Sequence, residues 1–532
     1  MHTLCKRMCI LFSLYYVHHM QGMHNNRNGR YCYTITMDMK YIAFNPLYTL
    51  KPDEGRTLVM ARLMGRNMLD GIEDSFTNAI HPIYAMILSF VDGREKRHCI
   101  SSAAESLGVS PDLVEKFVNS LIDNPKQIAM KATSGVSTFP PHTIVSSTQP
   151  MHEHRYQPEM FEYDKADVVM KRHATPSVLT LMVNNTCVTD CIYCYQDKSR
   201  RAHCTIPLER IIELIREAKQ LNVNTFDVIG GEFFLYPHWR EVLAELRNND
   251  YNPYLSTKMP VDEAIVRTLA QLNVLDIQIS LDTIIDSHLA DSLKVKPGYA
   301  ERMADSLRLL DKYHIPVMIH SVLTRHNGSE DDMKSLYDLF STLGNIKDWH
   351  IVKGDPTLYP RAPYSEIEIS AEAMGEAIRY LASIAKTSRF SIRYPEMMPQ
   401  DVDNQSSEAG MPAEADREEK FFDNRTFCSG LFSSLYILPD GKVTICEQLY
   451  WNPHFIVGDV MRSSIREIWN SEKAKSLYFI KQTDIPDDSL CHSCTRFDEC
   501  RNLRQVCYRE IVRKHGSDKW YYPDINCPFT TR

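Results

Sequence analysis

Residues 177–194 read SVLTLMVNNTCVTDCIYC, and this stretch decides the fold. An apolar run that suits a buried strand is followed by three cysteines, Cys187, Cys191 and Cys194, in the spacing C-x3-C-x2-C. Three thiolates on one short loop can hold three irons of a cubane cluster and leave the fourth iron open for a substrate. The aromatic Tyr193 stands directly before the last cysteine. We therefore interpret this stretch as a strand that ends in a cluster-binding loop.

The cysteine triplet resembles the signature of the radical S-adenosylmethionine (SAM) enzymes, in which the open iron is bound by the amino and carboxylate groups of SAM. The resemblance implies a 4Fe-4S cluster and SAM as cofactors, and it adds Tyr193 to the cofactor-binding residues. A zinc loop is the alternative, because C-x2-C pairs also suit tetrahedral zinc. Zinc sites usually pair two such units, whereas this triplet stands alone in its region.

Strand-like and helix-like segments alternate in the region that the triplet opens. We predict strands at 177–184, 225–229, 253–256, 275–281, 316–322 and 349–352. We predict helices at 207–221, 239–247, 261–272, 299–313 and 331–343. Such alternation indicates parallel strands with crossover helices. Six units give an α/β fold with a partial (β/α)6 TIM-like barrel, whose functional groups come from the carboxyl ends of the strands.

Gly230, Gly231 and Glu232 end the second predicted strand, in a turn that lets backbone approach a ligand and places one carboxylate beside it. In the radical SAM family the matching turn binds the methionine amino group. By similarity, Ser256 and Ser280, at the ends of the third and fourth strands, are assigned to the SAM carboxylate or ribose.

Asp282 follows the fourth predicted strand and is our candidate catalytic acid or base near the substrate. For each polar residue at these strand ends, a cap or turn role is an equally good interpretation.

A second group of cysteines lies near the carboxyl terminus. Cys428 is followed after twelve residues by Gly441, and Gly441 after four more by Cys446. The Pro439-Asp440-Gly441 turn separates two short apolar segments, which predicts a β-hairpin that brings the two thiols together. The remaining cysteines, which begin with the spacing C-x2-C-x5-C, are Cys491, Cys494, Cys500, Cys507 and Cys527.

Seven cysteines in this order resemble the auxiliary-cluster extension called SPASM, which implies a small cysteine-rich iron-sulfur domain with one or two auxiliary 4Fe-4S clusters. The family pattern gives one cluster to Cys491, Cys494, Cys500 and Cys527. It gives the other to Cys428, Cys446 and Cys507, with a further ligand that the sequence does not identify. Six residues separate Cys500 from Cys507 where three are typical, which puts Cys507 in question. A zinc ribbon at Cys491, Cys494 and Cys500 is the alternative.

The amino-terminal region combines short strands at 41–44 and 57–61, a helix at 82–90 and a helix pair at 100–107 and 111–122. The pattern resembles the winged-helix leader-peptide recognition domains of ribosomal peptide maturases, which add an extended peptide as a strand to a small sheet. A merely structural winged helix and a DNA-binding helix-turn-helix are alternatives. The second helix of the pair has two acidic residues and one lysine, a poor surface for phosphates.

Composition divides the chain into six parts. We predict an unstructured or mis-started extension at 1–38, a winged-helix-like α+β domain at 39–132, a linker at 133–165, the radical SAM barrel at 170–396, an acidic linker at 397–424 and a SPASM-like domain at 425–532. The first part imitates a secretory signal, but no clear small-residue cleavage site follows it. The acidic linker suits a solvated tether.

Charge and cysteine usage limit the classes of partner. The 532 residues carry a formal charge of −8, which provides no basic field for nucleic acid. Beyond the amino-terminal run, no apolar segment has membrane-spanning length. The fifteen cysteines fall mostly into two ligand-like groups, which favours metal in a reducing compartment. We therefore expect a cytoplasmic protein without nucleic-acid or membrane partners.

These patterns and resemblances predict a radical SAM oxidoreductase that matures a ribosomally made precursor peptide with a leader. The family implies hydrogen abstraction by a 5'-deoxyadenosyl radical, an intramolecular thioether or carbon-carbon crosslink as product, and flavodoxin or ferredoxin as electron donor. Oxidation of a Cys or Ser in a protein substrate, as in anaerobic sulfatase maturases, is the alternative enzymatic function. An iron-sulfur DNA-binding regulator is the alternative from another class.

Overall fold

The computed structural model describes residues 40–62, 76–151, 155–395, 421–422, 428–503 and 505–531. Contacts divide the chain into two compact units, 1–174 and 175–532, which we call unit 1 and unit 2. Each unit has its own hydrophobic core. In the described ranges, no helix combines the length and the apolar character that a membrane span requires. The predicted extension at 1–38 and nearly all of the predicted acidic linker at 397–424 lie outside the described residues.

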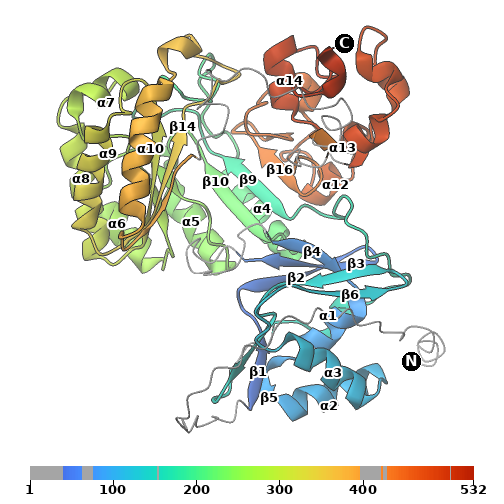
Figure 1. Ribbon diagram of the computed structural model, residues 1–532. Coiled ribbons are helices and arrows are strands. Elements are labelled where there is room, and N and C mark those ends of the chain that lie inside the picture. The colour runs from blue at the N-terminus through green and yellow to red at the C-terminus, as the bar shows by residue number, and fades with distance from the viewer. Residues whose placement is uncertain are drawn as a thin grey trace, which may run out of the picture. The chain divides into compact units, whose positions relative to one another are not determined.

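The described part of unit 1 contains two three-stranded sheets and a separate hairpin (Figure 1). One sheet has the order β5-β1-β8, the other has the order β2-β3-β4, and all neighbouring strands are antiparallel. The strands are β1 (Tyr41–Phe44), β2 (Tyr48–Asp53), β3 (Arg56–Ala61), β4 (Thr77–Ile80), β5 (Asp92–Glu95), β6 (Ile128–Ala132), β7 (Gly135–Phe139) and β8 (Ile144–Ser147).

The helices of unit 1 form where the sequence predicts them. They are α1 (Pro82–Ser89), α2 (Lys96–Leu107) and α3 (Pro111–Leu121). Gly108 ends α2 with a left-handed φ of 64°, which glycine adopts without strain. The apolar side of α3, including Phe117 and Leu121, is buried in the core of unit 1. Whether these elements amount to a winged helix stays a prediction.

The segment 133–165, predicted as a linker, is largely built into unit 1. It contains β7, which pairs with β6, and β8, which pairs with β1. Phe139 and Ile144 from these strands are fully buried in the core. Buried apolar side chains at these two positions outweigh the Ser, Thr and Pro content that predicts a linker.

Unit 2 contains the alternating strands and helices that the sequence predicts. The parallel strands are β9 (Val178–Met182), β10 (Thr225–Ile229), β11 (Ser256–Thr257), β12 (Ile277–Ser280), β13 (Val317–Leu323), β14 (Ile346–Lys353) and β15 (Ser391–Arg393). β11 is shorter than predicted, because Tyr254 N donates to Asp227 Oδ1 (2.7 Å) instead of joining a ladder.

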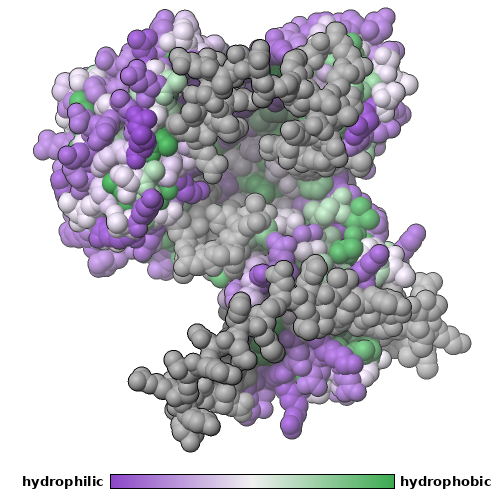
Figure 2. Space-filling view, in the orientation of Figure 1, coloured by the Kyte–Doolittle hydropathy of each residue, from purple (hydrophilic) through white to green (hydrophobic). Residues whose placement is uncertain are grey.

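The helices between these strands lie along the strand layers of unit 2 (Figure 1). They are α4 (Leu208–Gln220), α5 (Trp239–Asn248), α6 (Glu263–Gln271), α7 (Asp286–Leu293), α8 (Tyr299–Lys312), α9 (Glu330–Ser341) and α10 (Ala371–Ala385). Each buries an apolar stripe and leaves polar residues outside. The outer face of this helical layer is accordingly mostly hydrophilic (Figure 2).

Hydrogen bonding groups these strands into two sheets of unit 2, with orders β10-β9-β16-β17-β18 and β11-β12-β13-β14-β15. β16 (Ser434–Ile437) and β17 (Lys442–Thr444) form the hairpin predicted around Gly441, and β18 is Gly458–Asp459. β16 also pairs in parallel with β9, so the carboxyl-terminal cysteine region shares a sheet with the strand before the triplet. The fold is thus mixed α/β, and closure into a partial barrel remains an expectation.

Candidate active site

The cysteine triplet lies on the loop that follows β9, and neighbouring elements fix this loop at several points. Ile192 N donates to Ser292 O (2.9 Å) at the end of α7, and Asn185 N donates to Ala202 O (3.1 Å). The hydroxyl of Thr189 lies 3.3 Å from the sulfurs of both Cys187 and Cys191. The Thr189 hydroxyl therefore links two of the three thiols of this loop at the end of the strand.

The turn formed by Gly230, Gly231 and Glu232 lies directly against the start of this loop. Gly231 N donates to Asn184 O (2.8 Å), and Asn184 Nδ2 donates to Glu232 O (3.0 Å). A Cβ at Gly231 would lie 2.0 Å from Thr186 O, so only glycine fits there. The structure thus brings together the predicted Gly-Gly turn and the cysteine loop.

The side chain of Glu232 faces the protein interior rather than an open space. It is 1% exposed, and it accepts hydrogen bonds from Thr257 Oγ1 (2.7 Å) and Phe234 N (3.2 Å). Burial raises the pKa of Glu232 to about 7 against the opposing effect of these hydrogen bonds. Its carboxyl group joins the ends of β10 and β11, so its cofactor-binding role stays a prediction.

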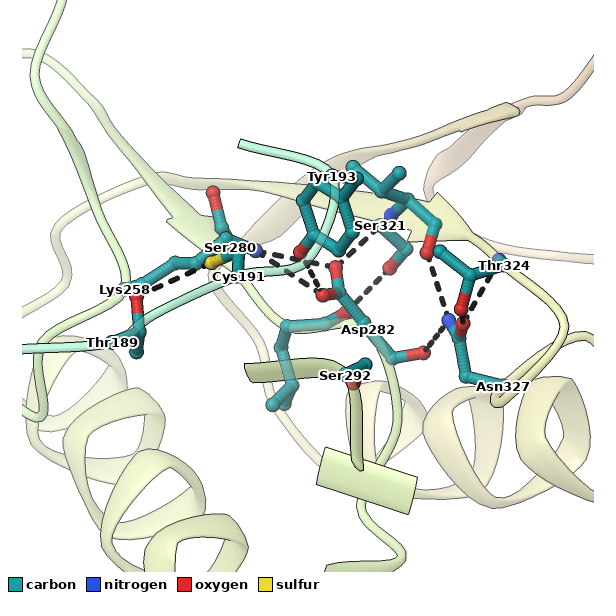
Figure 3. Close-up of polar contacts among 12 residues, drawn as sticks. Thr189, Cys191, Tyr193, Lys258, Ser280, Asp282, Ser292, Ser321, Thr324 and Asn327 are labelled. Atoms are coloured by element: carbon teal, nitrogen blue, oxygen red, sulfur yellow. Dashed lines mark hydrogen bonds and ion pairs between the residues drawn. The ribbon is translucent and has the colours of Figure 1, made fainter. Parts of the chain in front are cut away.

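Asp282 is the centre of a buried polar network (Figure 3). Its carboxylate accepts hydrogen bonds from the hydroxyl of Tyr193 and from Val322 N (3.0 Å). Lys258 Nζ lies 3.3 Å from each carboxylate oxygen. The side chain of Asp282 is fully buried, and that of Lys258 is 15% exposed. The sequence interpretation of Asp282 as an acid or base near the substrate remains a prediction, because the structure gives this carboxylate three partners within the protein.

The same network reaches the cysteine loop. Lys258 Nζ lies 5.4 Å from the ring centre of Tyr193. Burial raises the pKa of Cys191 to about 11, and the nearby charge of Lys258 opposes this shift. A buried cation beside the triplet therefore favours thiolate, which is the form that binds iron.

Ser256 and Ser280 are brought together by a glutamine that the sequence interpretation overlooks. Gln278 Nε2 donates to Ser256 Oγ (2.9 Å) and to Ser280 Oγ (3.5 Å). Ser280 lies in register with His320 of β13, and His320 with His350 of β14. A row of polar side chains therefore crosses this face of the sheet. Their period-two placement on strands is the sequence signal that could have identified them.

The first carboxyl-terminal cysteine group comes together across three elements. The pKa of Cys446 is raised to about 12, mainly by burial, and the nearby thiols of Cys428 and Cys507 contribute to this shift. Tyr195 lies near this group and near the triplet: burial raises its pKa well above the ordinary value, and both Cys194 and Cys446 add to the shift. The wide spacing before Cys507 thus does not prevent it from approaching its predicted partners.

The second group consists of Cys491, Cys494, Cys500 and Cys527. Burial raises the pKa of Cys527 to about 11, and the other three thiols act on it electrostatically. Gln482 Nε2 donates to the carbonyl oxygens of Cys491 (3.1 Å) and Cys494 (2.8 Å), which fixes the C-x2-C turn. The thiols that affect one another electrostatically thus fall into two sets, and their assignment as cluster ligands stays a prediction.

The chemistry of these donor sets fits iron-sulfur clusters. The donors are soft thiols, and buried Arg501 beside Cys491 has two nitrogens without hydrogen-bond partners, as expected beside an anionic group. Among the described residues, no three His, Cys, Asp or Glu side chains converge closely enough for a single metal ion.

Comparison with known proteins agrees with this geometry. The family model of the radical SAM superfamily matches residues 181–340, and that of the SPASM iron-sulfur cluster-binding domain matches residues 428–495. The chain is therefore a radical SAM superfamily enzyme with a SPASM domain. Its cofactors are SAM, the iron-sulfur cluster of the radical SAM domain and the auxiliary iron-sulfur clusters of the SPASM domain.

The fold is also similar to solved structures. The crystal structure of Streptococcus suis SuiB bound to S-adenosylmethionine is 12% identical, with 91% of this chain and 99% of that chain covered and a TM-score of 0.58. SuiB bound to its precursor peptide SuiA gives the same identity and coverage with a TM-score of 0.59. This likeness concerns the fold. No curated protein matches the chain by sequence.

Proposed function

We propose that this radical SAM enzyme modifies a ribosomally made precursor peptide, forming an intramolecular thioether or carbon-carbon crosslink. The proposal rests on one observation: the same chain combines the cysteine triplet and two carboxyl-terminal cysteine groups, all in unit 2, with a separate unit 1. The fold likeness extends over 91% of the chain to SuiB, whose structure was solved with its precursor peptide. Unit 1 is our candidate for leader recognition, through strand addition to one of its small sheets.

Within this function, Cys187, Cys191 and Cys194 would hold the first cluster. Gly230, Gly231, Ser256, Ser280 and Tyr193 would surround SAM, and Glu232 would hold the Gly-Gly turn in place through Thr257. When bound, these cofactors supply a reducing electron and a 5'-deoxyadenosyl radical. The chain itself excludes water and orients the target C-H bond. Asp282 keeps Tyr193 and Lys258 in position beside the loop.

The carboxyl-terminal groups would hold two auxiliary clusters, one at Cys491, Cys494, Cys500 and Cys527 and one at Cys428, Cys446 and Cys507. They would accept the electron released when the new bond forms. Flavodoxin or ferredoxin is the proposed reductant of the first cluster, and the cytoplasm is the proposed location.

The test uses anaerobically reconstituted enzyme, dithionite, SAM and a short peptide encoded beside the enzyme, with and without its leader. We expect 5'-deoxyadenosine in both reactions, and a product that has lost two hydrogens only with the leader. The crosslink should survive proteolysis as a joined fragment. Equal modification of the leaderless peptide would remove the leader claim.

The same reactions separate the alternatives. A sulfatase-maturase type oxidation would yield a carbonyl that reacts with hydrazides and no joined fragment. A DNA-binding regulator would show salt-sensitive DNA binding and no 5'-deoxyadenosine.

A further inference from the structure

The unusual spacing between Cys500 and Cys507 is resolved in the structure by a π-helical turn, Glu499–Leu503. Such turns accommodate inserted residues in a helix and are frequent at functional sites. Arg501 lies in this turn and is 1% exposed. This turn therefore places a permanently charged side chain in the interior of the cysteine-rich region.

The guanidinium of Arg501 is only partly satisfied by the protein. Its Nη2 donates to Tyr522 O (2.5 Å), Tyr521 O (3.3 Å) and Cys491 Sγ (3.5 Å). Its Nε and Nη1 atoms are buried without a hydrogen-bond partner. Among the described residues, no Asp or Glu forms an ion pair with it. Burial of a cation without an anion is strongly unfavourable.

The groups that face Arg501 are sulfurs and one phenol. Its positive charge lies near the thiols of Cys491 and Cys500, and 5.9 Å from the ring centre of Tyr508. The hydroxyl of Tyr508 is also buried, and it lies near Cys428 of the other group. The Tyr508 hydroxyl is close enough to Arg501 to interact with it, so it is one acceptor for the guanidinium. The other acceptors near Arg501 are the carbonyl oxygens of Tyr521 and Tyr522 and the sulfurs of Cys491 and Cys500.

We propose that Arg501 contacts the auxiliary cluster of Cys491, Cys494, Cys500 and Cys527 and raises its reduction potential. Hydrogen bonds to cluster sulfur and nearby positive charge both stabilise the reduced, more negative form. The inference rests on the proposed assignment of that cluster. It gives Arg501 a role in accepting the product electron, in addition to holding the chain at Tyr521 and Tyr522.

The test compares Arg501→Met and Arg501→Lys with Arg513→Met. Arg513 is a control from the same region, because its side chain is 32% exposed and pairs with Glu510 at the surface. Each reconstituted full-length protein is analysed for iron and sulfide. Each is then titrated with a reductant under electron paramagnetic resonance, without SAM or peptide.

We expect the Arg501→Met protein to retain its iron. Its auxiliary cluster should be harder to reduce than that of the wild type. The reduced-to-oxidised ratio at a fixed potential should fall about tenfold, a 59 mV shift for one electron. Arg501→Lys should lie between this variant and the wild type, and Arg513→Met should match the wild type. The potential of the first cluster should not change.

An unchanged auxiliary potential in a fully loaded Arg501→Met protein would overturn the inference and leave a purely structural arginine. If Arg501→Met fails to fold, Arg501→Gln, which removes the charge and keeps a polar side chain, is measured in its place, and a wild-type potential in it has the same meaning. The outcome is independent of peptide modification, since no peptide is present. If the wild-type protein contained zinc in place of iron and sulfide, the assignment of an auxiliary cluster to these cysteines would be wrong.

Discussion

The two cysteine regions of unit 2 each contain a buried cation, and the protein treats the two cations differently. Beside the triplet, Lys258 has a carboxylate partner, since Asp282 lies 3.3 Å from its Nζ. In the SPASM region, Arg501 has carbonyl and thiol partners and two unpaired nitrogens. The cation of the first site thus has an anionic partner in the chain, whereas no Asp or Glu among the described residues forms an ion pair with Arg501, for which we propose an anionic cluster as partner.

The largest expected effect separates the functions of the two regions. Cys194→Ala removes a thiolate of the triplet, so 5'-deoxyadenosine formation should fall to background. Cys494→Ala affects only the second region, so 5'-deoxyadenosine should persist while the modified peptide is lost. Chromatography of the nucleoside, mass spectrometry of the peptide and iron analysis measure all three quantities. Equal loss of 5'-deoxyadenosine in both variants would break the distinction.

The charge balance at the triplet predicts a strong effect of Asp282→Asn on stability. This variant leaves the largely buried Lys258 without its anion, which should lower the free energy of unfolding by about 3–5 kcal/mol. Glu368→Gln is the matched control, because Glu368 and its partner Lys353 are 45% and 40% exposed. It should cost less than about 1 kcal/mol. Denaturant titration measures both, and equal losses would contradict the idea of a buried pair.

Glu232 gives a pH test of the same interior. Its pKa is raised by burial from 4.5 to about 7, so between these values the folded state keeps a proton that the unfolded state has released. The stabilisation that Glu232 contributes should therefore be fully present below pH 4.5. It should fall by about 3 kcal/mol as the pH rises from 4.5 through about 7. Glu232→Gln should lose this dependence. If the free energy of unfolding changed with pH in the same way for Glu232→Gln and the wild type, the raised pKa of the Glu232 carboxyl would be contradicted.

The smallest effect concerns the turn beside the loop. Gly231→Ala places a methyl group against the backbone of Thr186 and should cost about 1–3 kcal/mol and weaken SAM binding. A Cβ at Gly230 would lie 3.1 Å from Asn184 Oδ1, a less severe contact than the 2.0 Å at Gly231, so Gly230→Ala should be milder. Unfolding experiments and SAM titration compare the two. A smaller effect of Gly231→Ala than of Gly230→Ala would contradict the tight contact between Gly231 and the backbone of Thr186.

Local signals explain what the sequence predicts well. The triplet, the Gly-Gly turn and the hairpin at Gly441 each depend on a few adjacent residues. The predicted strands from β9 to β14 form, except that the strand predicted at 253–256 is replaced by the two-residue β11, which shares only Ser256 with it. The structure adds pairings between distant segments. β16 joins β9 across more than two hundred residues, and no periodicity within either strand specifies that partner.

The interior charges were equally hidden from the sequence. Asp282 follows a strand like many surface residues, and only the packed fold shows that it is enclosed with Lys258 and Tyr193. The spacing after Cys500 looks like a defect in the cysteine pattern. In the structure Arg501 lies in the π-helical turn Glu499–Leu503 and is buried, a backbone geometry that spacing alone does not convey.

The most direct test of the account is anaerobic reconstitution of the full chain, followed by iron and sulfide analysis and reaction with SAM and dithionite. The account predicts more than one 4Fe-4S cluster per chain and production of 5'-deoxyadenosine that depends on Cys187, Cys191 and Cys194. A protein with a full complement of iron and sulfide that leaves SAM intact would contradict it.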